Sequence, residues 1–253
     1  MKLLVDGDII TFRAAFSAED ETEAWIACSR ADAMITEIVA ILGASSDDVE
    51  VWLSGPKNFR YGIYPEYKAN RITAKRPQWE HEVKKHLVRE WGAEWSKDCE
   101  ADDMLGVRQM QLLPDSCICT IDKDLDQIPG PHYNFVKKEQ YYVTPEEATR
   151  FFYYQCLVGD TADGIKGVPG IGPVKAKKLL DACDEEAHDR QTNVERLYYE
   201  CVLDQYSCYE EFEMNAKVLH IWKKEGEVWT DKYKAMDTSQ EEILYHLSAT
   251  ERH

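Results

Sequence analysis

The chain has 253 residues, of which 44% are hydrophobic and 30% are charged, and 47 acidic residues against 30 basic ones give it a formal net charge of −17. This length is enough for one large domain or two small ones with a buried core, and the composition excludes a disordered chain. A net charge this negative excludes a protein that coats nucleic acid through bulk charge, but it does not exclude an enzyme with local basic patches.

Signals for a membrane segment, a leader and disulfides are missing from the sequence. It contains no run of about 18 apolar residues that could cross a bilayer, and its apolar start is too short for a signal peptide. The eight cysteines include no CxxC pair, which predicts reduced, buried thiols and no structural zinc. We therefore expect a cytoplasmic protein without a membrane partner.

Three short apolar runs predict buried β-strands, and stretches with helical periodicity lie between them. The strands are expected over 2–6, 49–54 and 116–122. The helices are expected over 24–42, 77–91 and 100–113, and they are closed by Gly43, Gly92 and Pro114 in turn. The second of these helices is expected to carry Pro77 in its first turn.

The alternation of strands and helices up to about residue 135 predicts an α/β fold with a mostly parallel central sheet. The stretch Thr144-Pro145-Glu146-Glu147 has the cap, the proline and the early acids of a helix start. Everything after about residue 145 is expected to be helical. The expected organisation is an α/β domain over 1–144 and a helical subdomain over 145–253, with a loosely held helix at 230–253.

Acidic residues follow the ends of the predicted strands. Sites in open parallel sheets form at the carboxyl ends of the strands, so these side chains are expected to gather at one edge. Clustered carboxylates repel one another unless protons or cations neutralise them, and all-oxygen ligands favour Mg²⁺ or Mn²⁺. Two such ions suit in-line attack on a phosphodiester. The candidates are Asp6, Asp8, Glu100, Asp102, Asp103, Asp122, Asp124, Asp126, Asp160 and Asp163.

Each of these acids could instead cap a helix or lie as a solvated charge on the surface. With 47 acidic residues in the chain, many must do so. This alternative weighs most for Asp8, Asp103 and Asp126, and least for Asp6, Asp122 and Asp124, which stand at or just past the ends of apolar strands.

Two stretches are basic against this acidic background. One is YKANRITAKRPQW (67–79), with Lys68, Arg71, Lys75 and Arg76; the other is GDTADGIKGVPGIGPVKAKKLL (159–180), with Lys166, Lys175, Lys177 and Lys178. In the second stretch, Gly167, Gly170 and Gly172 let the backbone approach a ligand, and the helix starting near Pro173 offers N–H groups to a phosphate. The alternative is a tight connection between two helices.

The motifs together resemble the 5′ nuclease family, which comprises flap endonucleases, the 5′-nuclease domain of bacterial DNA polymerase I and bacteriophage 5′–3′ exonucleases. GDTADGIKGVPGIGPVKA resembles the helix–three-turn–helix motif of that family, and LLVDGDIITFR, YPEYKANR, EADD and IDKDLDQ resemble its other signatures in the same order. The resemblance covers residues 2 to about 180. It implies a PIN-like catalytic domain followed by a DNA-binding helical subdomain, and the small size suggests a phage or free-standing bacterial member.

The resemblance also implies roles for single residues. The family's metal ligands fall on Asp6, Glu100, Asp102, Asp103, Asp122, Asp124, Asp160 and Asp163. Lys68 matches the active-site lysine at the base of the helical arch, and Arg71 and Arg13 match positions that contact phosphates. Lys75 or Arg76 could supply a second cation of the arch. A K⁺ ion bound through backbone carbonyls would lie around Val168 and Ile171.

Two departures from the family pattern stand out. The family usually has an aspartate after its second strand, where this chain has Ser54. Either one ligand of the first metal is missing, or Asp8 compensates for it, which is our hypothesis. Only about two dozen residues separate YKANR from EADD, and most of them belong to the helix expected over 77–91. The arch is therefore expected to be short or open, which argues against threading of a long single strand.

The resemblance implies a 5′–3′ exonuclease or structure-specific flap endonuclease with two Mg²⁺ or Mn²⁺ ions. Its partner would be double-stranded DNA with a free 5′ end, a nick or a flap, and its place would be DNA replication. Two alternatives stay open at this point. One is a DNA-binding protein with a degraded nuclease site, which Ser54 favours; the other is a PIN-type ribonuclease, which lacks a helix–three-turn–helix motif.

Overall fold

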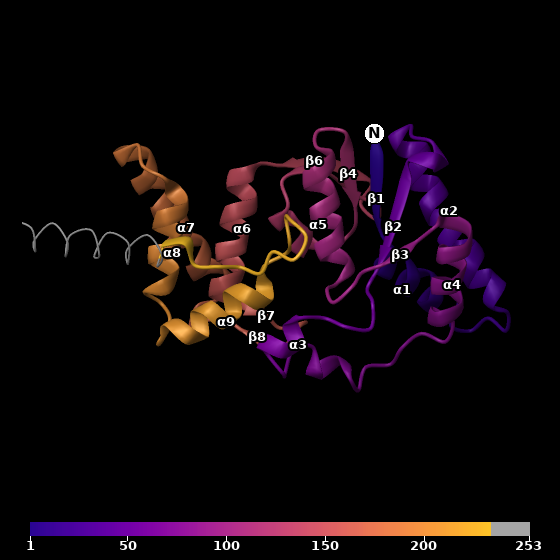
Figure 1. Ribbon diagram of the computed structural model, residues 1–253, viewed down its shortest axis with the longest axis horizontal. Helices are drawn as coiled ribbons and strands as arrows, with labels where there is room; N and C mark the ends of the chain where they lie inside the picture. Colours follow the sequence, from indigo (N-terminus) through magenta and orange to yellow (C-terminus); the bar gives the residue numbers. More distant parts are fainter. Residues whose placement is uncertain (234–253) are drawn as a thin grey trace, which may run out of the picture.

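The computed structural model describes residues 1–233, and its centre is a six-stranded sheet in the order β3-β2-β1-β4-β5-β6 (Figure 1). The first five strands in that order pair in parallel, and only β5 and β6 pair antiparallel. This confirms the expected α/β fold with a mostly parallel sheet. The strands are β1 Lys2–Asp6, β2 Val49–Leu53, β3 Glu94–Trp95, β4 Ser116–Cys119, β5 Gly130–Asn134 and β6 Glu139–Val143.

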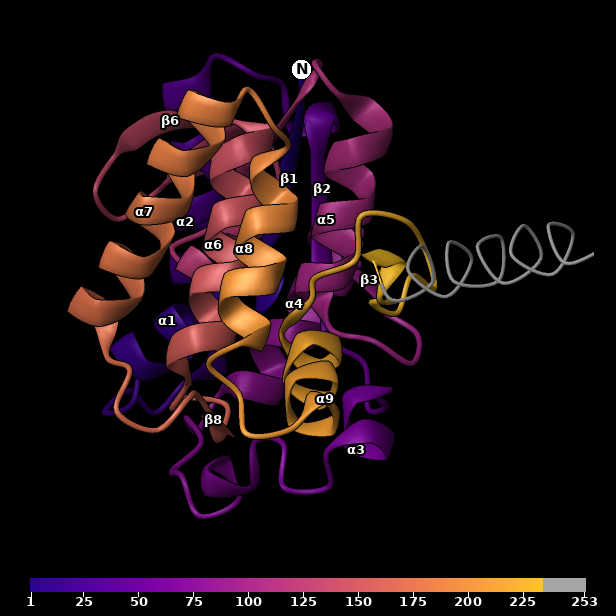
Figure 2. The same ribbon diagram turned by 90° about the vertical axis from the view of Figure 1, so that its left-hand side faces the viewer.

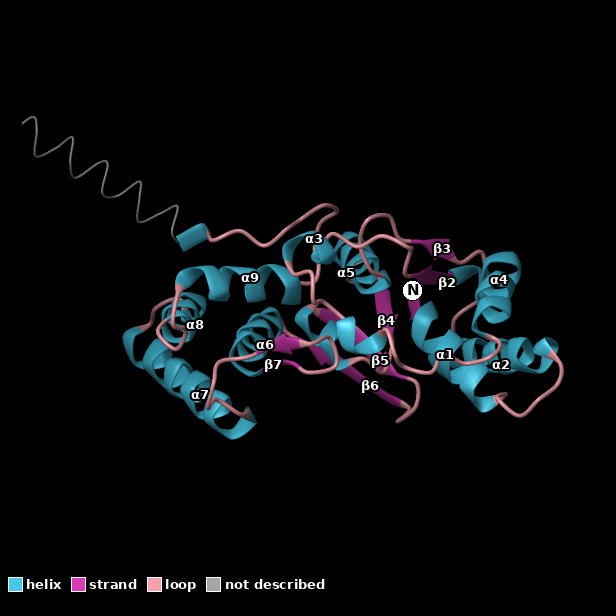
Figure 3. Ribbon diagram, turned by 90° about the horizontal axis from the view of Figure 1, so that it is seen from below, coloured by secondary structure: helices cyan, strands magenta, loops and turns pink. Residues whose placement is uncertain are grey.

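Alternating side chains of the strands enter two separate apolar clusters, because successive residues of a strand point to opposite faces. Leu3 and Val5 pack into the cluster that also takes side chains of α1 (Gly7–Ser17), α2 (Ala24–Leu42) and α4 (Glu80–Trp91). Leu4 and Trp52 point the other way, into a cluster with Leu105 of α5 (Ala101–Leu112). Figure 3 shows α5 on one side of the sheet and α1 and α2 on the other. The central strands β1 and β4 are therefore buried on both faces, as a parallel sheet requires, whereas the edge strands β3 and β6 are mostly exposed.

The structure confirms the helices expected over 24–42 and 100–113 and the helix starts expected at Pro145 and near Pro173, whereas the helices over 7–17 and 60–63 were not expected. The bounds of the α-helices are α1 Gly7–Ser17, α2 Ala24–Leu42, α3 Arg60–Ile63, α4 Glu80–Trp91, α5 Ala101–Leu112, α6 Pro145–Val158, α7 Pro173–Arg190, α8 Val194–Leu203 and α9 Tyr209–Leu219. Gly43 and Gly92 end α2 and α4 in the left-handed conformation that favours glycine. Thr144 caps α6 in a reciprocal capping box with Glu147.

Some expected elements differ from the structure. The helix expected over 77–91 begins only at Glu80, so Pro77 lies before its first turn. The strand expected over 116–122 ends at Cys119, and the acidic residues after it form the short 3₁₀ helix η3, Lys123–Gln127. The β5–β6 hairpin and the two-residue strand β3 were not expected.

The second half of the described chain packs around its own apolar cluster. Figure 2 shows α6, α7 and α8 side by side, and side chains of α6 to α9 share this cluster. We expected this region to be wholly helical, but β7 (Gly159–Asp160) and β8 (Ile165–Lys166) form a small hairpin between α6 and α7. Among residues 1–233, no helix has the length and apolar character needed to cross a membrane. The helix expected at 230–253 lies almost entirely outside the described residues.

Candidate active site

Asp6 ends the central strand and caps the helix that follows. Its Oδ1 accepts a hydrogen bond from the backbone N of Ile9 at 3.0 Å, and its Oδ2 accepts one from Oγ1 of Thr120 at 2.8 Å. Burial, with the nearby charges of Asp8 and Asp122, raises the pKa of Asp6 to about 7. At neutral pH a carboxyl group with this pKa is about half protonated, and no ion pair joins Asp6 to a basic side chain within residues 1–233.

Two carboxylates from the start of α5 face the same edge. Glu100 is the N-cap residue of α5, and Asp102 stands in its first turn. Burial raises the pKa of Asp102 well above its ordinary value, and the charges of Asp6, Asp122 and Glu100 raise it further. Asp6, Asp102 and Asp122 thus lie close enough to repel one another, as expected for strand ends that meet at one edge.

A second group of carboxylates comes from η3 and the β7–β8 hairpin. Asp122 caps η3 by accepting a bond from the backbone N of Asp124 at 2.9 Å. Burial raises the pKa of Asp124 to about 8, and the charges of Asp122 and Asp160 contribute. Asp160 accepts a bond from the backbone N of Ala162 at 2.8 Å, which orders the loop leading to Asp163.

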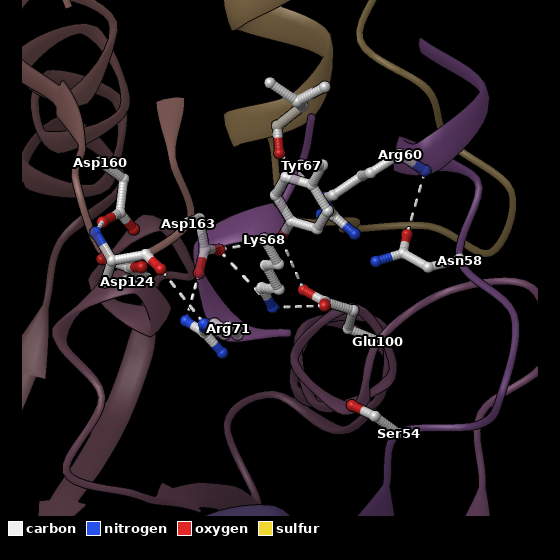
Figure 4. Close-up of polar contacts among 12 residues, drawn as sticks. Ser54, Asn58, Arg60, Tyr67, Lys68, Arg71, Glu100, Asp124, Asp160 and Asp163 are labelled. Atoms are coloured by element: carbon white, nitrogen blue, oxygen red, sulfur yellow. Dashed lines mark hydrogen bonds and ion pairs between the residues drawn. The ribbon is translucent and has the colours of Figure 1, made fainter. Parts of the chain in front are cut away.

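Lys68 lies between the two groups (Figure 4). Its ammonium contacts Glu100 and lies 3.5 Å from Oδ2 of Asp163, while Arg71 contacts the other oxygen of Asp163. Burial alone would raise the pKa of Glu100, but the positive charges of Lys68 and Arg60 hold it below its ordinary value. For Asp163, burial outweighs Lys68 and Arg71, and the pKa is raised.

Tyr67 is a site residue that the sequence did not single out. Its hydroxyl lies 2.9 Å from Oε2 of Glu100 and 2.9 Å from Oδ2 of Asp163. Burial raises the pKa of Tyr67, so the phenol stays protonated and donates its single hydrogen to one of these two carboxylates at a time. The position of Tyr67 beside Lys68 in YKANR could have indicated this role, because neighbouring residues of a tight turn can reach the same site.

One small cavity joins both groups. It has a volume of about 20 Å³, which is room for one water-sized particle. Its walls include carboxylates from α5, η3 and the β7–β8 region, namely Glu100, Asp102, Asp124, Asp160 and Asp163.

Asp103 is not brought into this cavity. It is fully buried, and its two oxygens accept hydrogen bonds from Nη1 and Nη2 of Arg60 at 2.6 and 2.8 Å. The same oxygens accept bonds from the backbone N atoms of Glu100 and Trp222. Nothing in the sequence indicated this pair, because Arg60 stands 43 positions before its partner.

Ser54 and Asp8 lie together, as the expected compensation requires, but Asp8 is already paired. The backbone N of Ser54 donates to Oδ2 of Asp8 at 2.9 Å, and the ammonium of Lys84 lies 2.9 Å from Oδ1. The hydroxyl of Ser54 accepts a bond from the backbone N of Ala101 at 2.9 Å. Asp126 turns toward Tyr141, whose hydroxyl donates to it at 2.8 Å.

The donor set fits hard divalent cations. Within residues 1–233, no three acidic, His or Cys side chains stand close enough to form a ready metal site, and Lys68 lies between Glu100 and Asp163. Burial and the repulsion between neighbouring carboxylates raise the pKa values of Asp6, Asp102 and Asp124, so a bound cation would stabilise their charged forms. Oxygen-only donors of this kind suit Mg²⁺ or Mn²⁺ better than softer ions.

The glycine-rich loop runs from the hairpin into α7, with most of its lysines on the surface. Lys166, Lys175 and Lys178 are exposed, and Lys177 pairs with Asp181 at 2.7 Å. Gly172 is the N-cap of α7, and Gly170 has a φ of +77° with open space beside it.

Gly167 differs from the other two glycines. A Cβ there would lie 2.2 Å from the backbone C of Val158, so this glycine allows the chain to approach itself. The side chains of Val168 and Ile171 are buried in the cluster of the helical half, which leaves only their backbone for any ion.

The other basic candidates lie around the stretch that follows YKANR. Arg13 is exposed on α1, Lys75 pairs with Glu19 at 2.5 Å, and Arg76 pairs with Glu80 at 2.7 Å. The helix α4 packs Val83 and Leu87 into the sheet cluster. Between Tyr64 and α4 there is no α-helix, only the short 3₁₀ turn η2 (Ala69–Arg71), so these residues form a short irregular connection.

Comparison with known proteins agrees with this geometry. A family model described as "5′-3′ exonuclease, N-terminal resolvase-like domain" matches residues 1–152. DNA polymerase I of Rhizobium leguminosarum is 34% identical over 161 residues, which are 55% of this chain and 15% of that protein. Flap endonuclease Xni of Shewanella piezotolerans is 30% identical over 153 residues, which are 51% of this chain and 56% of that protein. The matches therefore span little more than half of the second relative and a small part of the first.

Solved structures share the fold at low identity. The T5 5′-exonuclease with bound zinc ions superposes with a TM-score of 0.58 at 19% identity, covering 86% of this chain and 88% of that one. The catalytic core of Rad2 in complex with DNA superposes with a TM-score of 0.53 at 14% identity, covering 91% and 79%. Because a single family model covers more than half of the sequence, this chain belongs to the 5′–3′ exonuclease family, as its motifs predicted.

Proposed function

We propose that this protein is a 5′–3′ exonuclease or structure-specific 5′ flap endonuclease that hydrolyses DNA phosphodiesters with two divalent ions. The observation that carries the proposal is the cavity lined by carboxylates of both groups, with Lys68 between Glu100 and Asp163. Buried carboxylates that repel one another destabilise the fold, so such a cluster indicates a site for binding and chemistry.

One ion would be held by Asp6, Glu100, Asp102 and Asp122, and the other by Asp124, Asp160 and Asp163. Asp103 is left out, because its oxygens accept hydrogen bonds from Arg60. Mg²⁺ or Mn²⁺ bound there supplies charge that stabilises the phosphate in the transition state and lowers the pKa of the attacking water.

Lys68 and Arg71 are the side chains we assign to the scissile phosphate. Both now contact carboxylates, and an arriving phosphate would exchange these partners for its own oxygens. Water attacks the phosphorus in line, the bond to the 3′ oxygen breaks, and the downstream strand keeps a 5′-phosphate. The ammonium of Lys68 would stabilise negative charge that develops during this step.

The DNA duplex would be held away from the cut by the start of α7. The exposed Lys166, Lys175 and Lys178 and the N–H groups after Gly172 suit phosphates without reading base identity. Arg13, Lys75 and Arg76 would add contacts near the scissile end, and a K⁺ ion would bind backbone carbonyls around Val168 and Ile171. We further propose a cytoplasmic role in DNA replication, on duplexes with a free 5′ end, a nick or a flap.

A second candidate is a DNA-binding protein whose nuclease site has degraded. Ser54 favours it, since its hydroxyl accepts a backbone bond where the family usually has an acid. Asp8 beside it is neutralised by Lys84.

One experiment separates the two candidates. The protein is incubated with 5′-labelled duplex, nicked, flapped and single-stranded DNA, either with Mg²⁺ or with EDTA. An enzyme releases label only with Mg²⁺, and Asp124→Asn abolishes the release. DNA binding without release from any 5′ end, at any Mg²⁺ or Mn²⁺ concentration, would instead establish the second candidate.

A further inference from the structure

The segment Val218–Trp222, at the end of α9 and just beyond it, lies beneath the carboxylate cavity. Val218, Leu219 and Ile221 form part of the cavity wall. The carbonyls of Val218 and His220 accept hydrogen bonds from Arg60 at 2.8 and 2.7 Å. This segment comes from the far end of the described chain, yet it contacts the base of the proposed active site.

On its other side the same segment contacts a chain of two buried amides. The carbonyl of Leu219 accepts a bond from Nε2 of Gln127 at 2.8 Å, and the backbone N of Ile221 donates to Oε1 of Gln127 at 3.2 Å. Nε2 of Gln127 also donates to Oε1 of Gln155 at 2.6 Å, and Nε2 of Gln155 donates to Oδ1 of Asp124 at 2.9 Å. We call Gln127 and Gln155 the amide relay.

The amide relay is buried and each of its members is oriented by the one before it. Gln127 is 1% exposed and Gln155 is 4% exposed, so unpaired amide groups there would be costly. Ile221 and Leu219 fix which end of the Gln127 amide carries the oxygen. Gln127 then presents a donor to Oε1 of Gln155, which leaves Nε2 of Gln155 to face Asp124. The direction of the last bond therefore depends on the segment Val218–Trp222.

We propose that Gln155 is a positioning residue for Asp124, and that Val218–Trp222 fixes it through Gln127. The inference rests on the proposed function, in which Asp124 holds a divalent ion. Partners that orient a metal-binding carboxylate affect ion affinity although they never touch the ion. Gln127 ends the motif IDKDLDQ but was not singled out in it, and Gln155 lies outside the quoted motifs. The residues joined by the relay are 28 to 94 positions apart.

The test measures ion binding directly by titrating the full-length protein with Mn²⁺ in a calorimeter, without DNA. Gln155→Leu and Gln127→Leu each break the relay, and the double variant removes both amides. The matched control is Gln109→Leu: Gln109 is a fully buried glutamine of α5 whose amide bonds Pro131 and Ser116 and no carboxylate. Circular dichroism identifies the variants that fold. If Gln127→Leu does not fold, Gln155→Leu alone is enough for the test.

We expect Gln155→Leu to weaken one of two Mn²⁺ sites by about 10-fold or more, while the other site and the control stay near the wild-type affinity. Because the amides act in series, the double variant should bind Mn²⁺ as weakly as each single variant and no weaker. In cleavage assays the Mg²⁺ concentration at half-maximal rate should rise, whereas the rate at saturating Mg²⁺ changes less.

Two results would overturn the relay. One is a folded Gln155→Leu variant that binds both Mn²⁺ ions as the wild type does. The other is a double variant whose loss equals the sum of the two single losses, since independent amides would give that result. A wild-type protein that binds no Mn²⁺ at all would overturn the proposed function, and the relay with it.

Discussion

Arg60 and Asp103 form a buried, bidentate ion pair that joins α3 to the first turn of α5. The guanidinium also donates to the carbonyls of Val218 and His220, so one side chain links three distant segments. Asp103 is 0% exposed and Arg60 is 3% exposed. Removing either charge leaves the other in the interior without a counter-charge.

Asp103→Ala should therefore destabilise the protein by about 3–5 kcal/mol, because it leaves the guanidinium of Arg60 uncompensated. Urea unfolding in EDTA measures this loss. The double variant Arg60→Met/Asp103→Leu, which removes both charges, should unfold at a higher urea concentration than Asp103→Ala. If Asp103→Ala keeps the wild-type stability and loses only Mn²⁺ binding, Asp103 is a metal ligand after all.

Lys68→Met should reduce the cleavage rate on the order of 10²-fold, because a charge placed for the scissile phosphate is gone. Binding of Mn²⁺ should become tighter, since the ammonium no longer competes for Glu100 and Asp163. Single-turnover cleavage and calorimetry measure the two effects separately. Lys85→Met, on the exposed side of α4, serves as the control. A parallel loss of ion binding would contradict this role for Lys68.

The raised pKa of Asp124 predicts a pH dependence of stability in EDTA. The folded protein holds this proton up to a pKa of about 8, whereas the unfolded chain releases it near the ordinary value of 3.8. The folded state thus binds more protons between these two values, and the free energy of unfolding falls as the pH rises through that window. The substitution Asp124→Asn removes the carboxyl group that titrates, and with it this contribution to the pH dependence of stability.

Melting temperatures at pH 5 and pH 8 test this expectation. Wild-type protein in EDTA should melt at a lower temperature at pH 8, and Asp124→Asn should lose less of its stability between the two pH values. Mg²⁺ should restore stability to the wild type at pH 8 and do so less for the variant. An equal pH response of both proteins in EDTA would show that Asp124 does not titrate in this range.

Much of this fold could be predicted from local signals in the sequence. Gly43, Gly92 and the Thr144 capping box mark helix ends through conformations and hydrogen bonds that involve only near neighbours. Asp6 could be placed at the sheet edge because an apolar run ends there. The hairpin of β5 and β6 carried no such signal, since β6 is mostly exposed and lacks an apolar run.

The parts of the site that sequence reasoning missed depend on contacts between distant residues. Arg60 has its carboxylate partner 43 positions away, and Gln127 meets Leu219 92 positions away. In the sequence, nothing distinguishes Gln155 from other polar residues of α6, because only the fold places Asp124 within hydrogen-bonding distance of it. Periodicity and capping rules describe neighbours within a few residues, so they could not have found these pairs.

Gly167→Ala should destabilise the protein by about 1–3 kcal/mol or more, because its new Cβ would overlap the backbone of Val158. The strand β7, which carries Asp160, pairs with β8 next to this contact, so ion binding should weaken as well. Gly172→Ala is the matched control: it has open space and an ordinary φ of −94°. Thermal melting compares the two, and equal melting temperatures would contradict the tight approach at Gly167.

Lys175→Ala and Lys178→Ala should weaken duplex binding without changing its sequence preference, because lysines at the start of α7 would contact phosphates only. Each lost phosphate contact should lower the slope of log K against log salt by about 0.9. Lys177→Ala should cost less, since the ammonium of Lys177 already pairs with Asp181. Fluorescence anisotropy in EDTA at several salt concentrations measures these slopes without cleavage. An unchanged slope for the Lys175→Ala/Lys178→Ala double variant would show that these lysines do not contact the duplex, whether or not the protein cleaves DNA.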